Sequence, residues 1–203
     1  MKIINISVFC ILITSIAVSY ASAGTITDKD GNKYKTVKIG KTYWMAEDYR
    51  YESKYSECAN ENDNPDTCIR RYALSKMTLE DFTTKLCPIG WMVPGIRDVG
   101  DIVELIEPQW SDLSPKQQRQ ARTRVSNKLR SKLWNNGEDY FEFNATPNYV
   151  NVAIYPVIGQ SSFGDLTVFE FRITDNGYSL VETNRYAAPI PYNIRCIKQA
   201  DEK

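Results

Sequence analysis

Cysteine is the residue type whose number and spacing first suggest chemistry in this chain. Of five cysteines, Cys10 lies in an apolar N-terminal run, and Cys58, Cys68, Cys87 and Cys196 follow it. Without Cys10, which we expect to be removed with that N-terminal run, four cysteines remain. No Cys-x-x-Cys spacing is present among them to begin a zinc site, so this even number indicates two disulfide bonds. The sequence permits three pairings. We favour Cys58 with Cys68, which closes a loop rich in Asn, Asp and Pro, and Cys87 with Cys196, which ties the middle of the domain to its end.

Catalytic chemistry is restricted by the absence of histidine from the whole sequence. Ser-His-Asp and Cys-His catalysis and His-ligated zinc are therefore excluded. Glycoside hydrolysis needs two carboxylates across a sugar, and Glu142 and Glu170 are candidates without a motif that singles them out. We predict a protein without catalysis or a cofactor. The alternative is a secreted enzyme, carbohydrate-active or cysteine-based, that acts on envelope or extracellular polymer.

Calcium binding is the remaining metal chemistry that the sequence suggests. The run Asp28 to Asn32 resembles the start of an EF-hand, but Lys33 and Ile39 occupy the places of the required Gly and Glu. Glu107-Pro108-Gln109 and Trp134-Asn135-Asn136 resemble sugar-binding calcium motifs only superficially, because Gln109 and Asn136 stand where acids are needed. We therefore predict no metal site.

Two other groups of residues are candidates for binding. The stretch from Ser114 to Leu133 contains no acidic residue, and its cations predict a surface for anionic glycan, lipid headgroup or phosphate, or else a solvated helix face. These cations are Lys116, Arg119, Arg122, Arg124, Lys128, Arg130 and Lys132. Among 13 tyrosines we expect most to fill the core, and Tyr178 and Tyr186 to be exposed contacts for a ligand.

The first 23 residues are typical of a secretory signal peptide, with Lys2, a short apolar run and Ala21-Ser22-Ala23 before Gly24. The apolar run is too short to span a bilayer. We expect cleavage after Ala23 and a protein that is secreted, periplasmic or on the cell surface. The balance of 25 basic and 25 acidic residues gives no global charge that would favour nucleic acid.

Residues 24–203 are expected to form one α+β domain. Alternation around the Asp28 to Asn32 turn predicts a hairpin of Thr25 to Thr27 with Tyr34 to Ile39, followed by a strand over Thr42 to Met45. Helical periodicity predicts helices over 78–86, over 98–106 and from Ser114 to Leu133, with Ala121, Val125, Leu129 and Leu133 as the buried stripe of the last. Alternation with a period of two then predicts an antiparallel sheet. Its strands are Tyr140 to Phe143, Tyr149 to Tyr155, Thr167 to Ile173, Tyr178 to Glu182 and Tyr192 to Lys198.

Six segments, taken in order, resemble the Fibrobacter succinogenes major paralogous domain family. They are Asp30 to Tyr34, Val37 to Gly40, Trp44 to Asp48, Cys87 to Pro94, Lys128 to Ser131 and Ile194 to Lys198. The resemblance implies a C-type-lectin-like fold, in which the terminal strands pair and a long disulfide joins the helical region to the last strand, and it implies surface or secreted bacterial proteins. We expect a recognition or adhesion module whose ligand is an extracellular glycan or protein.

Overall fold

The computed structural model describes residues 22–59, 62, 64, 68–147, 151–183 and 191–200. The predicted signal peptide up to residue 21 and the predicted contact Tyr186 lie outside these residues. The described part is mixed helix and sheet, as the sequence predicts.

The first sheet joins the two ends of the domain. It is antiparallel, with the order β1 (Ser22–Thr27), β2 (Lys33–Ile39), β3 (Thr42–Met45) and β9 (Ile197–Gln199). Trp44 of β3 lies opposite Ile197 of β9. The predicted N-terminal hairpin is therefore present, and the chain end completes its sheet.

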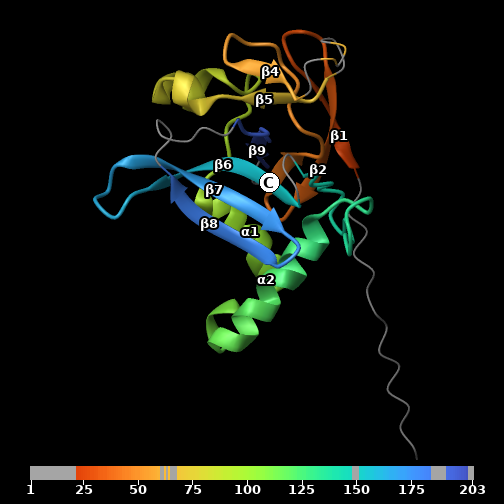
Figure 1. Cartoon of the computed structure of the whole chain (residues 1–203), viewed down its shortest axis with the longest axis vertical. Helices are drawn as coiled ribbons and strands as arrows, with labels where there is room; N and C mark the ends of the chain where they lie inside the picture. Colours follow the sequence, from red (N-terminus) through yellow and green to blue (C-terminus); the bar gives the residue numbers. More distant parts are fainter. Residues whose placement is uncertain are drawn as a thin grey trace, which may run out of the picture.

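The second sheet contains β6 (Val152–Gln160), β7 (Leu166–Thr174) and β8 (Gly177–Thr183), which are antiparallel in that order. It is the middle layer of the molecule, with α1 (Ile96–Ile106) and α2 (Pro115–Leu129) on one side and the pair of β4 (Ser56–Cys58) and β5 (Arg70–Tyr72) on the other (Figure 1). Successive side chains of a strand point to opposite faces, so this sheet contributes to an apolar cluster on each side. Tyr155 belongs to the cluster that includes residues of α1 and α2, and Ile154 belongs to the other cluster.

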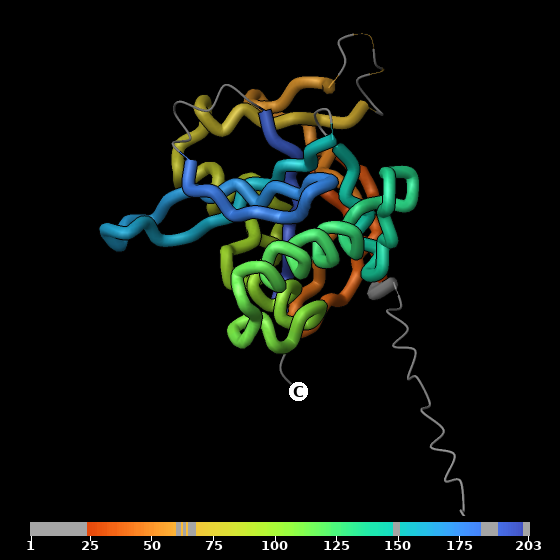
Figure 2. Tube along the Cα trace, turned by 60° about the horizontal axis from the view of Figure 1, so that its bottom comes forward, coloured from red at the N-terminus to blue at the C-terminus, as the bar shows by residue number. Residues whose placement is uncertain are grey.

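The helices follow their sequence signals. Ser114 begins α2, with Pro115 in the first turn and the Ser114 N–H donating to Gln117 Oε1 at 2.9 Å. Short helices precede and separate α1 and α2: the 3-10 turns η1 (Leu74–Lys76) and η3 (Trp110–Asp112), and η2 (Asp81–Lys85), which is a π-helix where the sequence predicts an α-helix. Figure 2 shows α2 running beside β8 and the β6–β7 hairpin projecting from the body.

Both favoured cysteine pairs are bonded in the structure. Cys58–Cys68 closes a loop with a sequence separation of 10, and Cys87–Cys196 joins residues 109 positions apart. Two disulfides fit an oxidising compartment outside the cytoplasm. Within the described residues, no helix is long and apolar enough to span a bilayer.

Two predicted elements are corrected by the structure. Residues 140–143 form no strand, although Phe141 and Phe143 are buried and their neighbours exposed, because Glu142 has φ +56° and turns the chain out of an extended ladder. The last helix ends at Leu129 rather than Leu133, and Leu133 is 99% exposed. Alternating burial is thus not by itself sufficient evidence for a strand.

The strands at the end of the chain are also shorter than predicted. The predicted strand over Tyr149 to Tyr155 begins at Val152, and residues 149–150 lie outside the described part. In the predicted strand over Tyr192 to Lys198, regular pairing begins only at Ile197, while Tyr192 makes an isolated bridge with Tyr72. Between Tyr192 and Ile197, the carbonyls of Ile194 and Cys196 accept single hydrogen bonds from the N–H groups of Tyr49 and Met45.

Candidate binding site

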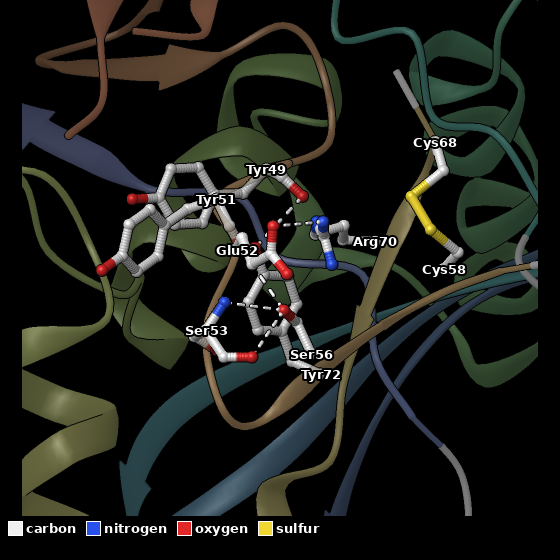
Figure 3. The surroundings of a disulfide bond; sticks show 9 residues. All are labelled: Tyr49, Tyr51, Glu52, Ser53, Ser56, Cys58, Cys68, Arg70 and Tyr72. Atoms are coloured by element: carbon white, nitrogen blue, oxygen red, sulfur yellow. Dashed lines mark hydrogen bonds and ion pairs between the residues drawn. A yellow bond between two sulfur atoms is a disulfide. The ribbon is translucent and has the colours of Figure 1, made fainter. Parts of the chain in front are cut away.

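The loop that follows β3 is held by a group of tyrosines. Tyr49 stacks on Tyr72 with ring centroids 6.1 Å apart and on Tyr51 at 5.9 Å, and it tilts against Tyr34 at 5.5 Å. The Tyr72 hydroxyl donates to the Tyr51 carbonyl at 2.7 Å (Figure 3). Burial raises the pKa of Tyr72 above its ordinary value, so its hydroxyl remains a donor. The aromatic stack therefore fixes the backbone at Tyr51.

The β1–β2 turn supports the same loop from the other side. The Asp28 carboxylate accepts hydrogen bonds from the Asp30 and Asn32 N–H groups, both at 2.9 Å, and from the Tyr34 hydroxyl at 2.6 Å. Asp30 Oδ2 in turn accepts the Glu52 N–H at 2.9 Å. The run that resembles a calcium loop thus uses its first carboxylate to shape its own turn.

The Cys58–Cys68 disulfide secures the far end of the loop. Arg70, in β5 next to this bridge, pairs with Glu52 at 3.0 Å, and Ser56 in β4 accepts the Ser53 N–H at 2.9 Å (Figure 3). Residues 51 to 55 are therefore anchored through both neighbouring strands and through the tyrosine stack.

A hollow of about 450 Å³ opens beside this segment, and we call it the tyrosine hollow. The side chains that line it come from the β1–β2 turn, the loop after β3, Met77 and η2. They are Lys29, Tyr51, Glu52, Ser53, Lys54, Tyr55, Met77, Asp81, Lys85 and Leu86. Tyr51 and Tyr55 are half-buried, whereas Met77 and Leu86 are buried.

Several polar side chains of the tyrosine hollow hydrogen-bond to one another. The Tyr55 hydroxyl donates to Asp81 Oδ2 at 2.7 Å, and Lys85 Nζ lies 3.0 Å from Asp81 Oδ1. These two hydrogen bonds lower the pKa of Asp81 to about 2, so it is a carboxylate at neutral pH. Lys54 Nζ lies 4.7 Å from the centre of the Tyr55 ring, and the hydrogen bond to Tyr55 raises the pKa of Lys54. The hollow therefore presents fixed donors and acceptors next to aromatic faces.

Three of the seven cations predicted to form a basic surface instead make contacts with other side chains of the protein. Arg130 is 1% exposed and binds Asp175 and Asn127, so it cannot belong to such a surface. Arg124 makes two hydrogen bonds to Glu107, at 2.6 and 2.8 Å, and Arg122 lies over the rings of Trp110 and Tyr178. The acids that pair with these cations, Glu107 and Asp175, lie outside residues 114–133, so the sequence of that stretch alone does not show them.

The other predicted cations are more open. Lys116 and Arg119 are exposed on α2, Lys128 lies 4.0 Å from the centre of the Tyr140 ring, and Lys132 is exposed beyond the helix end. The structure thus does not gather the seven cations on one helix face.

Tyr178 was expected to be exposed and is instead 8% exposed. Its ring lies 5.9 Å from that of Trp110 and 6.0 Å from that of Phe171, because the Asp175-Asn176 turn brings the start of β8 against α2. Tyr51 and Tyr55 are the half-buried tyrosines that line a hollow instead, and the sequence offers no signal for them beyond their place in a polar loop.

A buried ion pair joins two of the segments that carry the family resemblance. Arg195 Nε donates to Asp48 Oδ1 at 2.6 Å, and Arg195 also donates to the carbonyls of Met45, Phe143 and Asn144. Burial lowers the pKa of Arg195, but the charges and hydrogen bonds of Asp48 and Tyr155 together more than offset it, so the pKa is raised. Since every partner is part of the fold and both side chains are buried, this pair is structural.

The candidate carboxylates Glu142 and Glu170 differ in environment. Glu170 is 3% exposed, accepts the Tyr192 hydroxyl at 2.7 Å and pairs with Arg172, while Glu142 is exposed on a turn. In the part of the chain that the structure describes, no cluster of three or more acidic or cysteine side chains could hold a metal ion.

Comparison with known proteins supplies no relative: no family model, no curated protein and no solved structure matches the chain. The function therefore has to be argued from the site.

Proposed function

We propose that this chain is an exported recognition module without catalysis, with a C-type-lectin-like fold of the Fibrobacter succinogenes major paralogous type, and that it binds a saccharide in the tyrosine hollow. The observation that carries the proposal is the pair of half-buried rings, Tyr51 and Tyr55, on a segment that disulfide, stacking and hydrogen bonds hold rigid. A preformed site avoids part of the ordering cost of binding.

The chemistry of the lining favours sugar. Aromatic faces contact the C–H groups of a pyranose ring, and carboxylate and ammonium groups exchange hydrogen bonds with hydroxyls. Asp81 accepts, while Lys54 and Lys29 donate. An aliphatic ligand would desolvate these charges without offering them a hydrogen bond.

Support for the family part of the proposal comes from the same six segments. The pairing of β3 with β9, the Cys87–Cys196 bridge and the Asp48–Arg195 pair each join an early or central segment of the resemblance to the last one. The signal-peptide pattern and the two disulfides support export.

The test is a glycan array probed with the oxidised protein at low and high salt, followed by calorimetric titration of the hits. We expect Tyr55→Ala to weaken a hit about tenfold or more, because a stacking face of this kind contributes on the order of 1.5 kcal/mol. Tyr140→Ala is the matched control, since Tyr140 is 46% exposed and does not line the hollow. Equal binding by wild type and Tyr55→Ala would refute the proposed site.

Other outcomes of the same array would replace the proposal. Release of shortened glycans during incubation would favour the enzyme alternative. Binding confined to polyanions and lost in salt would favour the cations on and after α2, because exposed charges are screened beyond about 10 Å at 0.1 M salt.

A further inference from the structure

Strand β8 is an outer strand of the second sheet, with β7 on one side only. In an antiparallel ladder, alternate residues direct both backbone groups toward the partner strand, and the residues between them direct theirs away. The residues of β8 that direct their backbone groups outward can therefore be identified once one hydrogen-bonded residue pair of the sheet is known.

The turn between β6 and β7 supplies such a pair. The Ser161 N–H bonds to the Asp165 carbonyl at 2.8 Å, so in the register of these strands Pro156 and Ile158 face away from β7. Two observations agree: the Ile158 N–H instead bonds to the Pro94 carbonyl at 2.8 Å, and Pro156 has no N–H to give. The residues of β7 that do not bond to β6 bond to β8, and Val168, Glu170 and Arg172 are among them. In the register of β7 with β8, the backbone groups of Tyr178, Leu180 and Glu182 therefore point away from β7.

The outward groups fall into a covered half and an open half. The Tyr178 carbonyl accepts Arg122 Nη1 at 3.3 Å, because α2 packs against the start of β8. Leu180 and Glu182 have no hydrogen-bond partner for their outward groups within the described residues, and Leu180, Val181 and Glu182 are all exposed. The open half of β8 is a template for another extended backbone.

A second hollow, of about 570 Å³, lies along this edge on the face to which Tyr178 and Leu180 point. Trp110, Val103 and Pro108 give it an apolar floor, and Gly100 of α1 lines it. A Cβ added at Gly100 would meet no atom within 4 Å, so the hollow is empty up to the surface of α1.

The charges around the open edge favour a cationic partner. Asp101 and Glu104 line the hollow and have no ion-pair partner in the described part of the chain, and Glu182 is exposed on β8. The cations nearby are Arg97, which lines the hollow, and Arg122, which is held over the rings of Trp110 and Tyr178 at the covered half of β8. An arginine side chain suits such a site, because its stem packs on apolar surface and its guanidinium pairs with carboxylates. On the other face of β8, Val181 is 37% exposed and offers an apolar contact.

We propose that β8 binds an extended polypeptide segment by strand addition at Leu180 and Glu182, with basic side chains over the hollow beside α1 and apolar side chains beside Val181. The partner pairs with β8 through main-chain hydrogen bonds, which supply affinity, while alternate side chains supply selection. This site is separate from the tyrosine hollow, with which it shares no lining residue.

The experiment titrates the oxidised protein with a fluorescent acetyl-Arg-Val-Arg-Val-Arg-Val amide. Glu182→Pro removes an outward N–H and blocks the edge while leaving the bonds to β7, as Pro156 already does in β6. Glu182→Thr is the matched control that removes the charge and keeps the N–H. We expect about a tenfold or greater loss of affinity for Glu182→Pro and about threefold or less for Glu182→Thr, since loss of a main-chain hydrogen bond and blocking of the edge outweigh one exposed charge.

Three further measurements separate the proposal from its rivals. The same peptide N-methylated at every residue should not bind, and Gly100→Trp, which fills the hollow, should weaken binding as Glu182→Pro does. Unchanged melting of both variants shows that the fold is kept. Equal affinity for Glu182→Pro and Glu182→Thr, or full binding by the N-methylated peptide, would overturn strand addition. A dimer in light scattering that Glu182→Pro dissociates would assign the edge to a second copy of the chain and overturn the proposed partner.

Discussion

The buried pair of Asp48 with Arg195 gives the sharpest prediction about stability. Asp48→Asn keeps the size of the side chain and removes its charge, which leaves the guanidinium of Arg195, a residue 2% exposed, without a counter-charge. The remaining partners of Arg195 are neutral carbonyls and the Tyr155 hydroxyl. Breaking one side of a buried ion pair costs about 3–5 kcal/mol, so we expect a loss of that size in the free energy of unfolding.

The assay is equilibrium urea unfolding of the oxidised protein at pH 7, followed by fluorescence. Glu80→Gln is the control, because it removes one carboxylate from an ion pair with Lys85 in which the side chains are 73% and 60% exposed. Such a pair contributes about 0–1 kcal/mol. A loss for Asp48→Asn no larger than that of the control would refute the assignment of Asp48 and Arg195 as a buried structural pair.

Three other predictions concern the disulfides, acid stability and backbone strain. Loop-closure entropy for separations of 109 and 10 residues gives about 5 kcal/mol for removing Cys87–Cys196 and about 3 kcal/mol for Cys58–Cys68, measured by urea unfolding of the paired Ser variants; the reverse order would contradict this reasoning. Because the pKa of Asp81 is lowered to about 2 in the folded state, its contribution to stability is complete above the ordinary value of 3.8 and is lost as the pH falls through about 2. In acid unfolding, the free energy of unfolding of Asp81→Asn should therefore depend less on pH between 3.8 and about 2 than that of the wild type. An unchanged pH dependence would count against the hydrogen bonds from Tyr55 and Lys85. Glu142→Gly should stabilise the protein by about 0.5–1 kcal/mol in thermal melts, because φ is +56° there, whereas Lys132→Gly on the same segment, where no positive φ is relieved, should not.

Local signals in the sequence were sufficient for several elements. The Ser114-Pro115 start of α2, the stripe of Val99, Ile102 and Val103 in α1, and the turn at residues 28–32 depend on contacts within a few residues. The number and spacing of cysteines likewise led to the pairs found in the structure. The helix start, the stripe and the turn are decided by covalent neighbours and by periodicity, whereas the four cysteines narrowed the pairing to three alternatives.

What the sequence alone could not decide depends on residues distant along the chain. The charge of Arg130 is buried against Asp175 and that of Arg124 is matched by Glu107, so a stretch that is basic in the sequence is not a basic surface. Tyr178 is buried because α2 packs beside β8, and Tyr51 and Tyr55 are presented because the β1–β2 turn and η2 meet around them. The open edge of β8 exists only once three strands are in register. Burial and pairing are properties of the packed molecule, since the free energy of a side chain depends on what the tertiary fold places next to it.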